Sequence, residues 1–484
     1  MRRRDFLKLA GLSAGAAALP LGCVSPQRAR QGDPAAPPNI LFILADDLGY
    51  ADLGCYGQTK IRTPNLDRLA REGTRFTQYY SGHPVCAPSR CSLLSGLHTG
   101  HTFIRDNREV KEGIFLQGQQ AVPEGTCVLP RLLKSRGYAT ACIGKWGLGG
   151  VGTSGDPLAQ GFDHFFGYNC QRHAHNYYPS FLIRNREKVP LEGNDGTSAT
   201  GRQYAPDLMA EEALAFIQQN RDRPFFLYFS TTVPHMALQV PEDSLAEYRG
   251  RFDDKPYDGK KGYQPHPAPR AAYAAMITRL DRDIGRMMQR LKELGLEDRT
   301  LVCFASDNGP TFNGGTDSAF FQSAGPLHGL KAQVYEGGIR VPMIVRWPGR
   351  IPAGRVTDQV SAAWDVLPTV ADILGAETPV KIDGVSLLPT LQGKPGQRQH
   401  EYLYWESSGL QGGEQGLRWG DWKGVRTQIH KNPNAPLTLF NLKDDLGETR
   451  DLAREQPDVA AKVLRLMKAA HEPSPEFPFK ELDS

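Results

Sequence analysis

A short apolar segment that ends in two acidic residues limits the folds open to this chain. Residues 39–45 read Asn-Ile-Leu-Phe-Ile-Leu-Ala, and Asp46 and Asp47 follow directly. An unbroken apolar run of this length is typical of a strand covered on both faces, as in the parallel sheets of α/β proteins. The segment therefore predicts a buried strand with two carboxylates at its carboxyl end.

Three other segments repeat this pattern of a buried strand followed by polar residues. They are residues 139–143 before Gly144 and Lys145, residues 225–230 before Pro234 and His235, and residues 300–305 before Asp307 and Asn308. In open α/β sheets, ligands bind beyond the carboxyl ends of the strands. We therefore expect four strand ends to bring Asp, Asn, His and Lys side chains to one site.

Segments with helical spacing alternate with these strands, since their apolar residues recur every three or four positions. They are residues 65–73, 128–136, 206–220, 271–294 and 363–374. The alternation predicts an α/β fold over residues 39–392, with a large mixed, mostly parallel sheet sandwiched by helices.

The pattern changes after about Gly393. Shorter pieces bearing Tyr and Trp follow at residues 401–405, 415–426 and 437–441, and then a helical pattern at residues 457–471. These pieces predict a smaller carboxyl-terminal α+β subdomain over residues 393–484, formed by an antiparallel sheet and a helix.

The first residues of the chain are typical of an export signal. Arg3 and Arg4 precede an apolar stretch at residues 9–21 that is too short to span a bilayer. We therefore interpret residues 1–22 as a signal peptide of the twin-arginine type, which implies the twin-arginine export machinery as a partner. Residues 23–38 form a polar linker with several prolines.

The end of this signal leaves two outcomes open. Residues 19–23, Leu-Pro-Leu-Gly-Cys, resemble a lipoprotein box in which Cys23 would be lipidated. Ordinary cleavage near Ala18 or Cys23 would instead release a free periplasmic protein. The expected location is the periplasm or the cell surface, with membrane contact only through a lipid on Cys23.

The net charge argues against one class of partner. Of a formal charge of +4, three charges lie in the first eight residues, which leaves +1 for the rest of the chain. Nucleic-acid binding requires clustered Lys and Arg, so no nucleic-acid partner is expected. The eight cysteines show no spacing of a disulfide-rich domain or a zinc site. Cys142 and Cys303 are expected to be apolar residues within strands.

The acidic residues at the strand ends favour a hard metal ion. Asp46, Asp47, Asp307 and Asn308 offer only oxygen ligands. Such donors suit Ca²⁺ or Mg²⁺ rather than zinc, and the amide oxygen favours Ca²⁺. Each pair taken singly could equally cap a helix or form a turn. Two pairs that end two buried strands favour the metal site.

The segment that gives a specific resemblance is residues 86–90. It reads Cys-Ala-Pro-Ser-Arg and resembles the Cys-x-Pro-Ser-Arg motif of the sulfatases, arylsulfatase-like members of the alkaline phosphatase superfamily. Other motifs follow in the family's order, at residues 39–67, 144–146, 234–235, 306–309, 331–342, 420–423 and 439–452. The resemblance extends over about residues 39–455.

The resemblance implies a sulfate ester hydrolase with a modified cysteine. In the family, a maturation enzyme oxidises this cysteine, here Cys86, to formylglycine, which is also a metal ligand. One hydroxyl of the hydrated aldehyde attacks sulfur and expels the alcohol. The second hydroxyl then re-forms the aldehyde and releases sulfate.

The resemblance also implies roles for the residues around Cys86. Arg90 would hold the formylglycine hydroxyl, and Lys145 and Lys331 would bind sulfate oxygens. His235 or Lys331 would protonate the leaving oxygen. Asp307 would serve both as a metal ligand and as the proton acceptor for the nucleophile.

One position departs from the family pattern. The family commonly has Gly-Lys-Trp-His-Leu-Gly, but Gly147 stands here in place of the histidine. His173 or His175, in the segment 171–178, could fill the gap and bind substrate; an ordinary surface loop is the alternative. Because this segment holds two His and two Tyr, we expect a sulfated carbohydrate, or else a sulfated small molecule such as an aryl sulfate. A sugar of the galactose or N-acetylgalactosamine type is a working hypothesis that no residue of the sequence specifies.

Other functions are weighed against this one. A formylglycine-dependent phosphonate or phosphodiester hydrolase is the nearest alternative, and a non-catalytic sugar-binding lipoprotein with unmodified Cys86 is another. An alkaline phosphatase-like hydrolase is disfavoured because few histidines lie at the strand ends. A disulfide or half metal site between Cys86 and Cys91 is disfavoured because no second ligand pair accompanies it.

Overall fold

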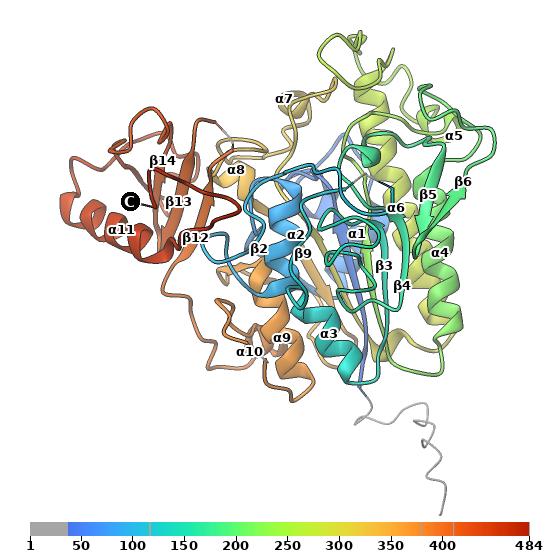
Figure 1. The fold of residues 1–484 in the computed structure, drawn as a ribbon, viewed down its shortest axis with the longest axis horizontal. Coiled ribbons are helices and arrows are strands. Elements are labelled where there is room, and N and C mark those ends of the chain that lie inside the picture. The colour runs from blue at the N-terminus through green and yellow to red at the C-terminus, as the bar shows by residue number, and fades with distance from the viewer. Residues whose placement is uncertain (1–36, 116–117, 379, 410, 484) are drawn as a thin grey trace, which may run out of the picture. The chain divides into compact units, whose positions relative to one another are not determined.

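The computed structural model describes residues 37–115, 118–378, 380–409 and 411–483. The signal peptide, the lipoprotein box and the linker up to residue 36 lie outside these residues. A mixed sheet of eleven strands crosses the described body (Figure 1). Its strands are β1 (Asn39–Ala45), β2 (Thr74–Tyr80), β3 (Ala139–Lys145), β4 (His164–Tyr168), β5 (Phe181–Arg184), β6 (Glu187–Pro190), β7 (Phe225–Ser230), β8 (Thr300–Ser306), β9 (Arg340–Arg346), β10 (Arg355–Thr357) and β11 (Ser361–Ala362).

Strand β1 lies at the centre of this sheet. The order is β10-β2-β9-β8-β1-β7-β3-β4-β5-β6, and β11 pairs with β2. Strands β8, β1, β7, β3 and β4 are parallel, and β9, β5 and β6 introduce the antiparallel pairs. Because parallel strands end at one edge, the residues after β1, β3, β7 and β8 meet there. The four strands expected from the sequence are confirmed.

The apolar sequence of β1 reflects two separate cores. Leu41 and Ile43 point into one hydrophobic cluster, and Phe42 and Leu44 point into the other, on the opposite face of the sheet. Alternate side chains of a strand point to opposite faces, so only an unbroken apolar run satisfies both cores.

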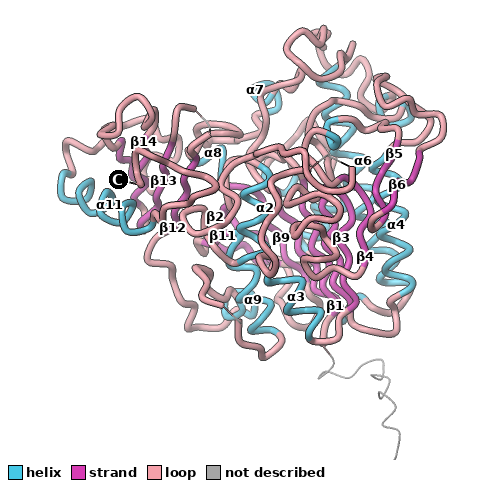
Figure 2. The backbone as a smooth tube through the Cα atoms, viewed as in Figure 1, coloured by secondary structure: helices cyan, strands magenta, loops and turns pink. Residues whose placement is uncertain are grey.

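Helices cover both faces of the sheet (Figure 2). The first cluster contains residues of α1 (Pro64–Arg71), α4 (Ala205–Gln219), α5 (Glu242–Leu245), α6 (Pro269–Glu293) and α7 (Ser318–Phe321). The second contains residues of α2 (Cys86–Ser95), α3 (Val128–Ser135), α9 (Val366–Ile373) and α10 (Leu388–Gln392). The predicted helices are present within a few residues, although 363–365 form a 3₁₀ turn before α9. Among the described residues, no helix has the length and hydropathy needed to cross a membrane.

The carboxyl-terminal part contains an antiparallel sheet and a helix, as expected. The strands are β12 (Leu403–Ser407), β13 (Glu414–Trp419), β14 (Trp422–Arg426) and β15 (Thr438–Asn441), and the helix is α11 (Pro457–Ala470). The expected piece at 415–426 is a hairpin of two strands, which turns at Gly420 with φ of 58°. The boundary at residue 393 stays a prediction.

Buried carboxylates tie this part to the segment that leads into α8 (Glu336–Ile339). Glu414 accepts a hydrogen bond from Val334 N at 3.1 Å, and Glu448 accepts one from Glu336 N at 2.8 Å. Lys423 on β14 donates to Glu336 Oε1 at 2.9 Å, and both side chains are fully buried. These bonds hold residues 334–336, which lie shortly after Lys331.

Candidate active site

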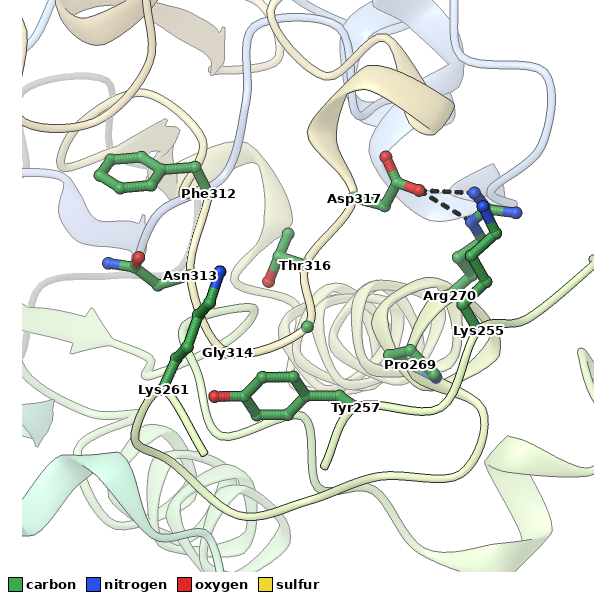
Figure 3. A pocket seen from close by; sticks show the side chains of 11 residues that line it. Lys255, Tyr257, Lys261, Pro269, Arg270, Phe312, Asn313, Gly314, Thr316 and Asp317 are labelled. Carbon is green, nitrogen blue, oxygen red and sulfur yellow. Dashed lines mark hydrogen bonds and ion pairs between the residues drawn. The ribbon is translucent and has the colours of Figure 1, made fainter. Parts of the chain in front are cut away.

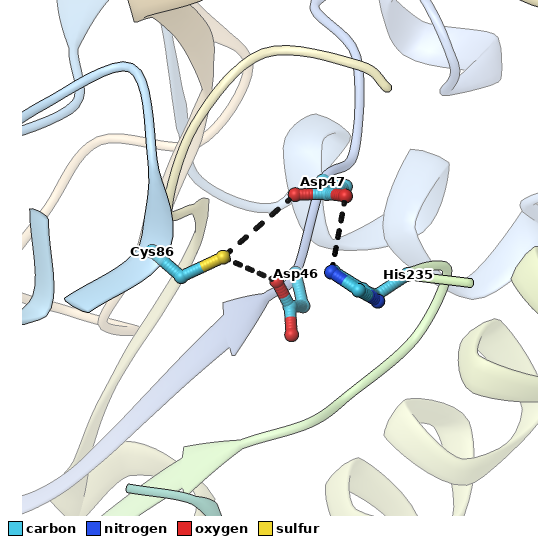
Figure 4. Close-up of side chains that lie close together, drawn as sticks. All are labelled: Asp46, Asp47, Cys86 and His235. Atoms are coloured by element: carbon cyan, nitrogen blue, oxygen red, sulfur yellow. Dashed lines mark hydrogen bonds and ion pairs between the residues drawn. The ribbon is translucent and has the colours of Figure 1, made fainter. Parts of the chain in front are cut away.

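Cys86 faces the two carboxylates at the end of β1 (Figure 4). Its Sγ lies 3.3 Å from Asp46 Oδ1 and 4.0 Å from Asp47 Oδ1. Asp47 has φ of 66°, and its N–H donates to Asp307 Oδ1 at 3.1 Å. This left-handed backbone directs two successive carboxylates toward the same side chain, whereas the extended strand before them alternates. The structure thus joins the cysteine motif to the first acidic pair.

The position of Cys86 keeps its thiol protonated. Cys86 is the first residue of α2, and every residue of this helix is buried. Burial raises the pKa of the thiol, and the negative charge of Asp46 raises it further. An unmodified Cys86 is therefore a poor thiolate nucleophile. Cys86 and Cys91 are both free, which excludes the disulfide considered for them.

Arg90 lies one helical turn after Cys86 and crosses the site. Its Nη2 is 2.7 Å from Asp307 Oδ2 and 3.6 Å from Asp46 Oδ2. Its Nη1 donates to the carbonyl of Lys145 at 2.8 Å and to Ser230 Oγ. The guanidinium therefore links α2 with the ends of β1, β3, β7 and β8 and fixes the orientation of both carboxylates.

Two lysines pair with the carboxylates beside Cys86. Lys145 Nζ lies 2.7 Å from Asp46 Oδ2 and is fully buried. Lys331 Nζ lies 2.6 Å from Asp47 Oδ1 and 3.6 Å from Cys86 Sγ. Burial opposes the charge of both lysines, but the adjacent aspartates outweigh it and raise the pKa of each. Both ammonium groups therefore remain charged, and that of Lys331 also contacts the cysteine.

The aspartates respond differently to this environment. Burial would raise the pKa of Asp46, but the neighbouring cations, Lys145 first among them, hold it well below its usual range. For Asp307, burial together with the charge of Asp46 raises the pKa to about 6. The carboxylates therefore differ in proton affinity although they share Arg90.

Asn308 provides evidence that the site suits a cation. Its Nδ2 donates to Asp47 Oδ1 at 2.8 Å, which leaves Oδ1 buried and without a hydrogen-bond partner among the described residues. A buried, unpaired carbonyl oxygen is costly unless a further group binds it. Ligand atoms of Asp46, Asp47, Cys86 and His235 lie within 4.8 Å of one another, and Asp307 and Asn308 are hydrogen-bonded to Asp47. The carboxylate and amide oxygens of these residues fit Ca²⁺ or Mg²⁺.

The charges of the cluster are balanced before any ligand binds. Three carboxylates, of Asp46, Asp47 and Asp307, face three cations, of Arg90, Lys145 and Lys331. A divalent cation would give the cluster an excess of two positive charges. A sulfate monoester carries one negative charge and would be attracted to this excess.

His235 lies on the other side of Asp47. Its Nε2 is 3.7 Å from Asp47 Oδ2, and its Nδ1 lies 2.6 Å from the carbonyl of Met236. This contact assigns the proton of the neutral ring to Nδ1 and leaves Nε2 facing the site. Burial and the charge of Lys331 hold the pKa of His235 well below its usual range.

The two histidines considered for the vacant position of the motif lie in different surroundings. The ring of His175 stacks on His235 with centroids 4.8 Å apart, so the structure brings His175 to the site. His173 packs instead between Tyr168 and Phe181, at 5.0 and 4.5 Å, and is not brought to the cluster. Whether either contacts substrate stays a prediction.

Gln171 occupies the space beside Gly147. A Cβ atom added at Gly147, where φ is 88°, would lie 2.3 Å from Gln171 Nε2. This Nε2 is buried and has no hydrogen-bond partner among the described residues. The amide of Gln171 therefore lies where a side chain at position 147 would begin.

Three residues near the site were not expected from the sequence. Gln171 fills the space at Gly147, Ser230 binds Arg90, and the ring of Tyr263 lies 5.2 Å from that of His175. Ser230 could have been inferred, because it is the last residue of a predicted strand at the same sheet edge. Gln171 and Tyr263 lie on irregular segments, for which no periodic pattern indicates the position.

Comparison with family models gives matches over most of the chain. The model described as Sulfatase matches residues 38–376. A second model, described as N-sulphoglucosamine sulphohydrolase, C-terminal, matches residues 328–472. The first match contains every residue of the cluster around Cys86, and the second contains the carboxyl-terminal sheet.

Individual proteins are similar over long stretches. Steryl-sulfatase of Mus musculus is 30% identical over 91% of this chain and 82% of its own length. N-acetylgalactosamine-6-sulfatase of Canis lupus familiaris is 35% identical over 74% of this chain, which spans 66% of that relative's length. The solved structure of Ps i-CgsB in complex with k-i-k-neocarrahexaose has a TM-score of 0.75 and 28% identity, covering 90% of this chain and 92% of that chain.

Proposed function

Because this chain belongs to the sulfatase family and is a sulfuric ester hydrolase, we propose that it hydrolyses sulfated carbohydrates with a formylglycine formed at Cys86 beside a Ca²⁺ ion. One observation carries the proposal: Cys86 Sγ is buried between Asp46, at 3.3 Å, and Lys331, at 3.6 Å. A nucleophile at this position would have carboxylates on one side to hold a metal ion and a cation on the other to bind an anion.

The metal ion would be held by Asp46, Asp47, Asp307 and Asn308. The unpaired Oδ1 of Asn308 supports a fourth oxygen donor, and a set of carboxylate and amide oxygens suits Ca²⁺, with Mg²⁺ as the alternative, although a His235 nitrogen also lies beside Asp47. Bound there, the ion would lower the pKa of a coordinated hydroxyl and neutralise charge on a sulfate oxygen.

Formylglycine would supply chemistry that the thiol does not. Its hydrated form offers one hydroxyl to attack sulfur and a second whose deprotonation returns the aldehyde and releases sulfate. The raised pKa of the Cys86 thiol supports this role, because an unmodified side chain is held in its unreactive form. The modification requires a maturation enzyme as a partner.

The surrounding side chains would position and neutralise the sulfate. Lys145 and Lys331 pair as cations with the two aspartates beside Cys86 and would bind sulfate oxygens. Arg90 would orient residue 86 and keep Asp307 in place as a proton acceptor. A proton for the leaving oxygen would come from Lys331, because the neutral ring of His235 holds its proton on Nδ1 and its Nε2, which faces the site, can only accept a hydrogen bond.

A sulfated carbohydrate is the proposed substrate. Among the similar proteins, one is named N-acetylgalactosamine-6-sulfatase and another was solved in complex with a neocarrahexaose. These names support a galactose or N-acetylgalactosamine unit. His175 and Tyr263 add ring faces beside His235, and flat aromatic faces suit the apolar side of a sugar.

The location of the enzyme is proposed from residues 1–23. Arg3 and Arg4 support twin-arginine export to the periplasm or the cell surface, and Cys23 supports a lipid anchor. Since this route carries folded proteins, and Cys86 is buried in the fold, modification of Cys86 would precede export.

The experiment is a comparison of the parent with Cys86→Ala and Cys91→Ala. Both cysteines are buried in α2, but only Cys86 faces the carboxylates, so Cys91→Ala is the matched control. We expect the parent and the control to carry an aldehyde at residue 86, seen by peptide mass and by an aminooxy probe, and to release sulfate from 4-nitrophenyl sulfate. Cys86→Ala should do neither while unfolding cooperatively.

Two further measurements separate this function from its alternatives. Elemental analysis should find one bound calcium per chain, and Asn308→Ala should lower the affinity for this ion. Turnover of matched phosphate diesters and phosphonate esters should be slower than that of sulfate esters. Sulfate release by Cys86→Ala would refute the mechanism, and faster turnover of a phosphorus ester would refute the substrate class.

A further inference from the structure

A pocket with both polar and apolar lining lies beside the active-site segments, apart from the cluster around Cys86. Its volume is about 500 Å³, which is in the range of pockets that bind small ligands. One wall is formed by the segment 255–261, with Lys255, Tyr257 and Lys261, and the other by the segment 312–317 (Figure 3).

The second wall is continuous with the metal-binding strand end. Phe312 follows Asn308 by four residues, so the chain between them spans about 14 Å at most. Thr311 contacts the sulfur of Met236, the residue after His235, at 3.7 Å. The backbone of Gly314 also packs on the side chain of Met236. This wall therefore begins at the active site.

The first wall also reaches the active site. Tyr257 pairs through its backbone with His266 and donates from its hydroxyl to the carbonyl of Gly262, which closes the segment into a loop. Tyr263, in the same loop and two residues after Lys261, has its ring 5.2 Å from that of His175. A molecule that extends from His175 past Tyr263 would therefore meet Lys261.

The charges in the pocket favour an anion. Asp317 is the one acidic residue lining it, and Arg270 neutralises it through two contacts of 2.6 and 2.9 Å. Lys255 and Lys261 line the pocket without a hydrogen bond or ion pair to any residue in the described part of the chain. The lining residues thus carry a net positive charge, although the charge of Lys255 also acts on nearby Asp317 and that of Lys261 on nearby Asp258.

Polar and aromatic groups accompany these charges. Thr316 Oγ1 is shielded from solvent and has no hydrogen-bond partner within the described residues. Figure 3 shows the Thr316 side chain on the side of the pocket that also holds the ammonium group of Lys261 and the ring of Tyr257. A buried hydroxyl without a partner, beside an aromatic face, is suited to a ligand that carries its own hydroxyl groups.

We propose that this pocket binds a second sulfated sugar unit of the substrate, so that the enzyme recognises an oligosaccharide with more than one sulfate. A sulfate would bind at Lys261 or, at the opposite end of the pocket, at Lys255 (Figure 3); Thr316 would hydrogen-bond a sugar hydroxyl, and Tyr257 would pack on the ring. The proposal rests on the proposed function, because it assumes that the sulfate at Cys86 belongs to a carbohydrate.

Binding to a chain that cannot turn over tests the proposal. Cys86→Ala is titrated calorimetrically with hexasaccharides of carrageenan and of chondroitin sulfate, and with the same sugars after chemical desulfation. We expect at least one sulfated hexasaccharide to bind more tightly than its desulfated form. Adding Lys255→Ala with Lys261→Ala should weaken that binding about tenfold or more, as for loss of a charge-assisted hydrogen bond.

Two control substitutions distinguish a site from a general charge effect. Lys260→Ala removes a charge from the same loop, but Lys260 pairs with Asp258 and does not line the pocket. It should leave the affinity within about twofold. Thr316→Val keeps the shape and the charge and should still weaken binding, because it removes the buried hydroxyl.

The outcomes separate this proposal from the proposed function. Equal weakening by Lys260→Ala, no effect of the double variant, or no preference for sulfated sugar would each overturn the pocket proposal. The proposed function is judged separately, by sulfate release from 4-nitrophenyl sulfate by the parent, since this substrate is too small to reach the pocket.

Discussion

A side chain placed at Gly147 should destabilise the protein through Gln171. With φ of 88°, Gly147 holds a backbone conformation that costs other residues about 1–2 kcal/mol. The added Cβ of Gly147→Ala would also lie 2.3 Å from Gln171 Nε2, which must then move. The end of this side chain is flexible, so the second cost is in the lower part of the range for overpacking, about 1–2 kcal/mol. We expect Gly147→Ala to lower the free energy of unfolding by about 2–4 kcal/mol in total.

The two costs can be separated by a double-mutant cycle. In a Gln171→Ala background the clash is removed, so Gly147→Ala should cost only about 1–2 kcal/mol. Gly137→Ala is the matched control, because Gly137 has φ of 81° and no atom within 4 Å of an added Cβ. It should show the backbone cost alone.

The assay is equilibrium unfolding in urea, with the metal concentration held constant. If Gly147→Ala lowers the free energy of unfolding equally in the parent and in Gln171→Ala, Gln171 does not occupy the space of the absent histidine. A loss no larger than that of Gly137→Ala would lead to the same conclusion.

Three further predictions follow from the site and its supports. Removal of metal with a chelator should lower the melting temperature by several degrees, and Ca²⁺ should restore it, because an ion that binds only the folded state stabilises that state; calorimetry that detects no shift contradicts the metal site. His175→Ala should lower kcat on aryl sulfates about 100-fold, whereas His173→Ala, distant from the cluster, should stay near the parent rate; the reverse order in steady-state kinetics would show that stacking on His235 is not the relevant contact. Burial raises the pKa of Glu414 from 4.5 to about 7, so the folded state loses stability as pH rises from 4.5 through 7. The free energy of unfolding of Glu414→Gln should therefore exceed that of the parent by up to about 3 kcal/mol at pH 8 but by almost nothing at pH 4. A difference in urea midpoint between variant and parent that does not change with pH would refute this.

The sequence was informative where regular structure placed the chemistry. Asp46 and Asp307 follow apolar runs that only a strand with two covered faces explains, and parallel neighbours must end at one edge. Their convergence was therefore predictable before any coordinates. Cys86 and Lys331 follow no such strand, and only the resemblance to a family assigned them to the site.

The remaining contacts depend on irregular backbone. Gln171, Tyr263 and Thr316 lie on segments whose course is set by individual turns and side-chain bonds rather than by a period of two or 3.6 residues. Nothing in the sequence near Gly147 indicates that a residue 24 positions later fills its space. The pocket beside Lys261 was unpredictable for the same reason.

The bonds from Glu414 and Glu448 to the backbone of residues 334–336 also concern how such enzymes can be engineered. A carboxyl-terminal sheet taken from another protein would have to reproduce two carboxylates and the buried Lys423 at matching positions, or the segment after Lys331 would lose its anchors. The exchangeable module in this architecture is therefore not the sheet alone. It is the sheet together with the loop that carries Lys331.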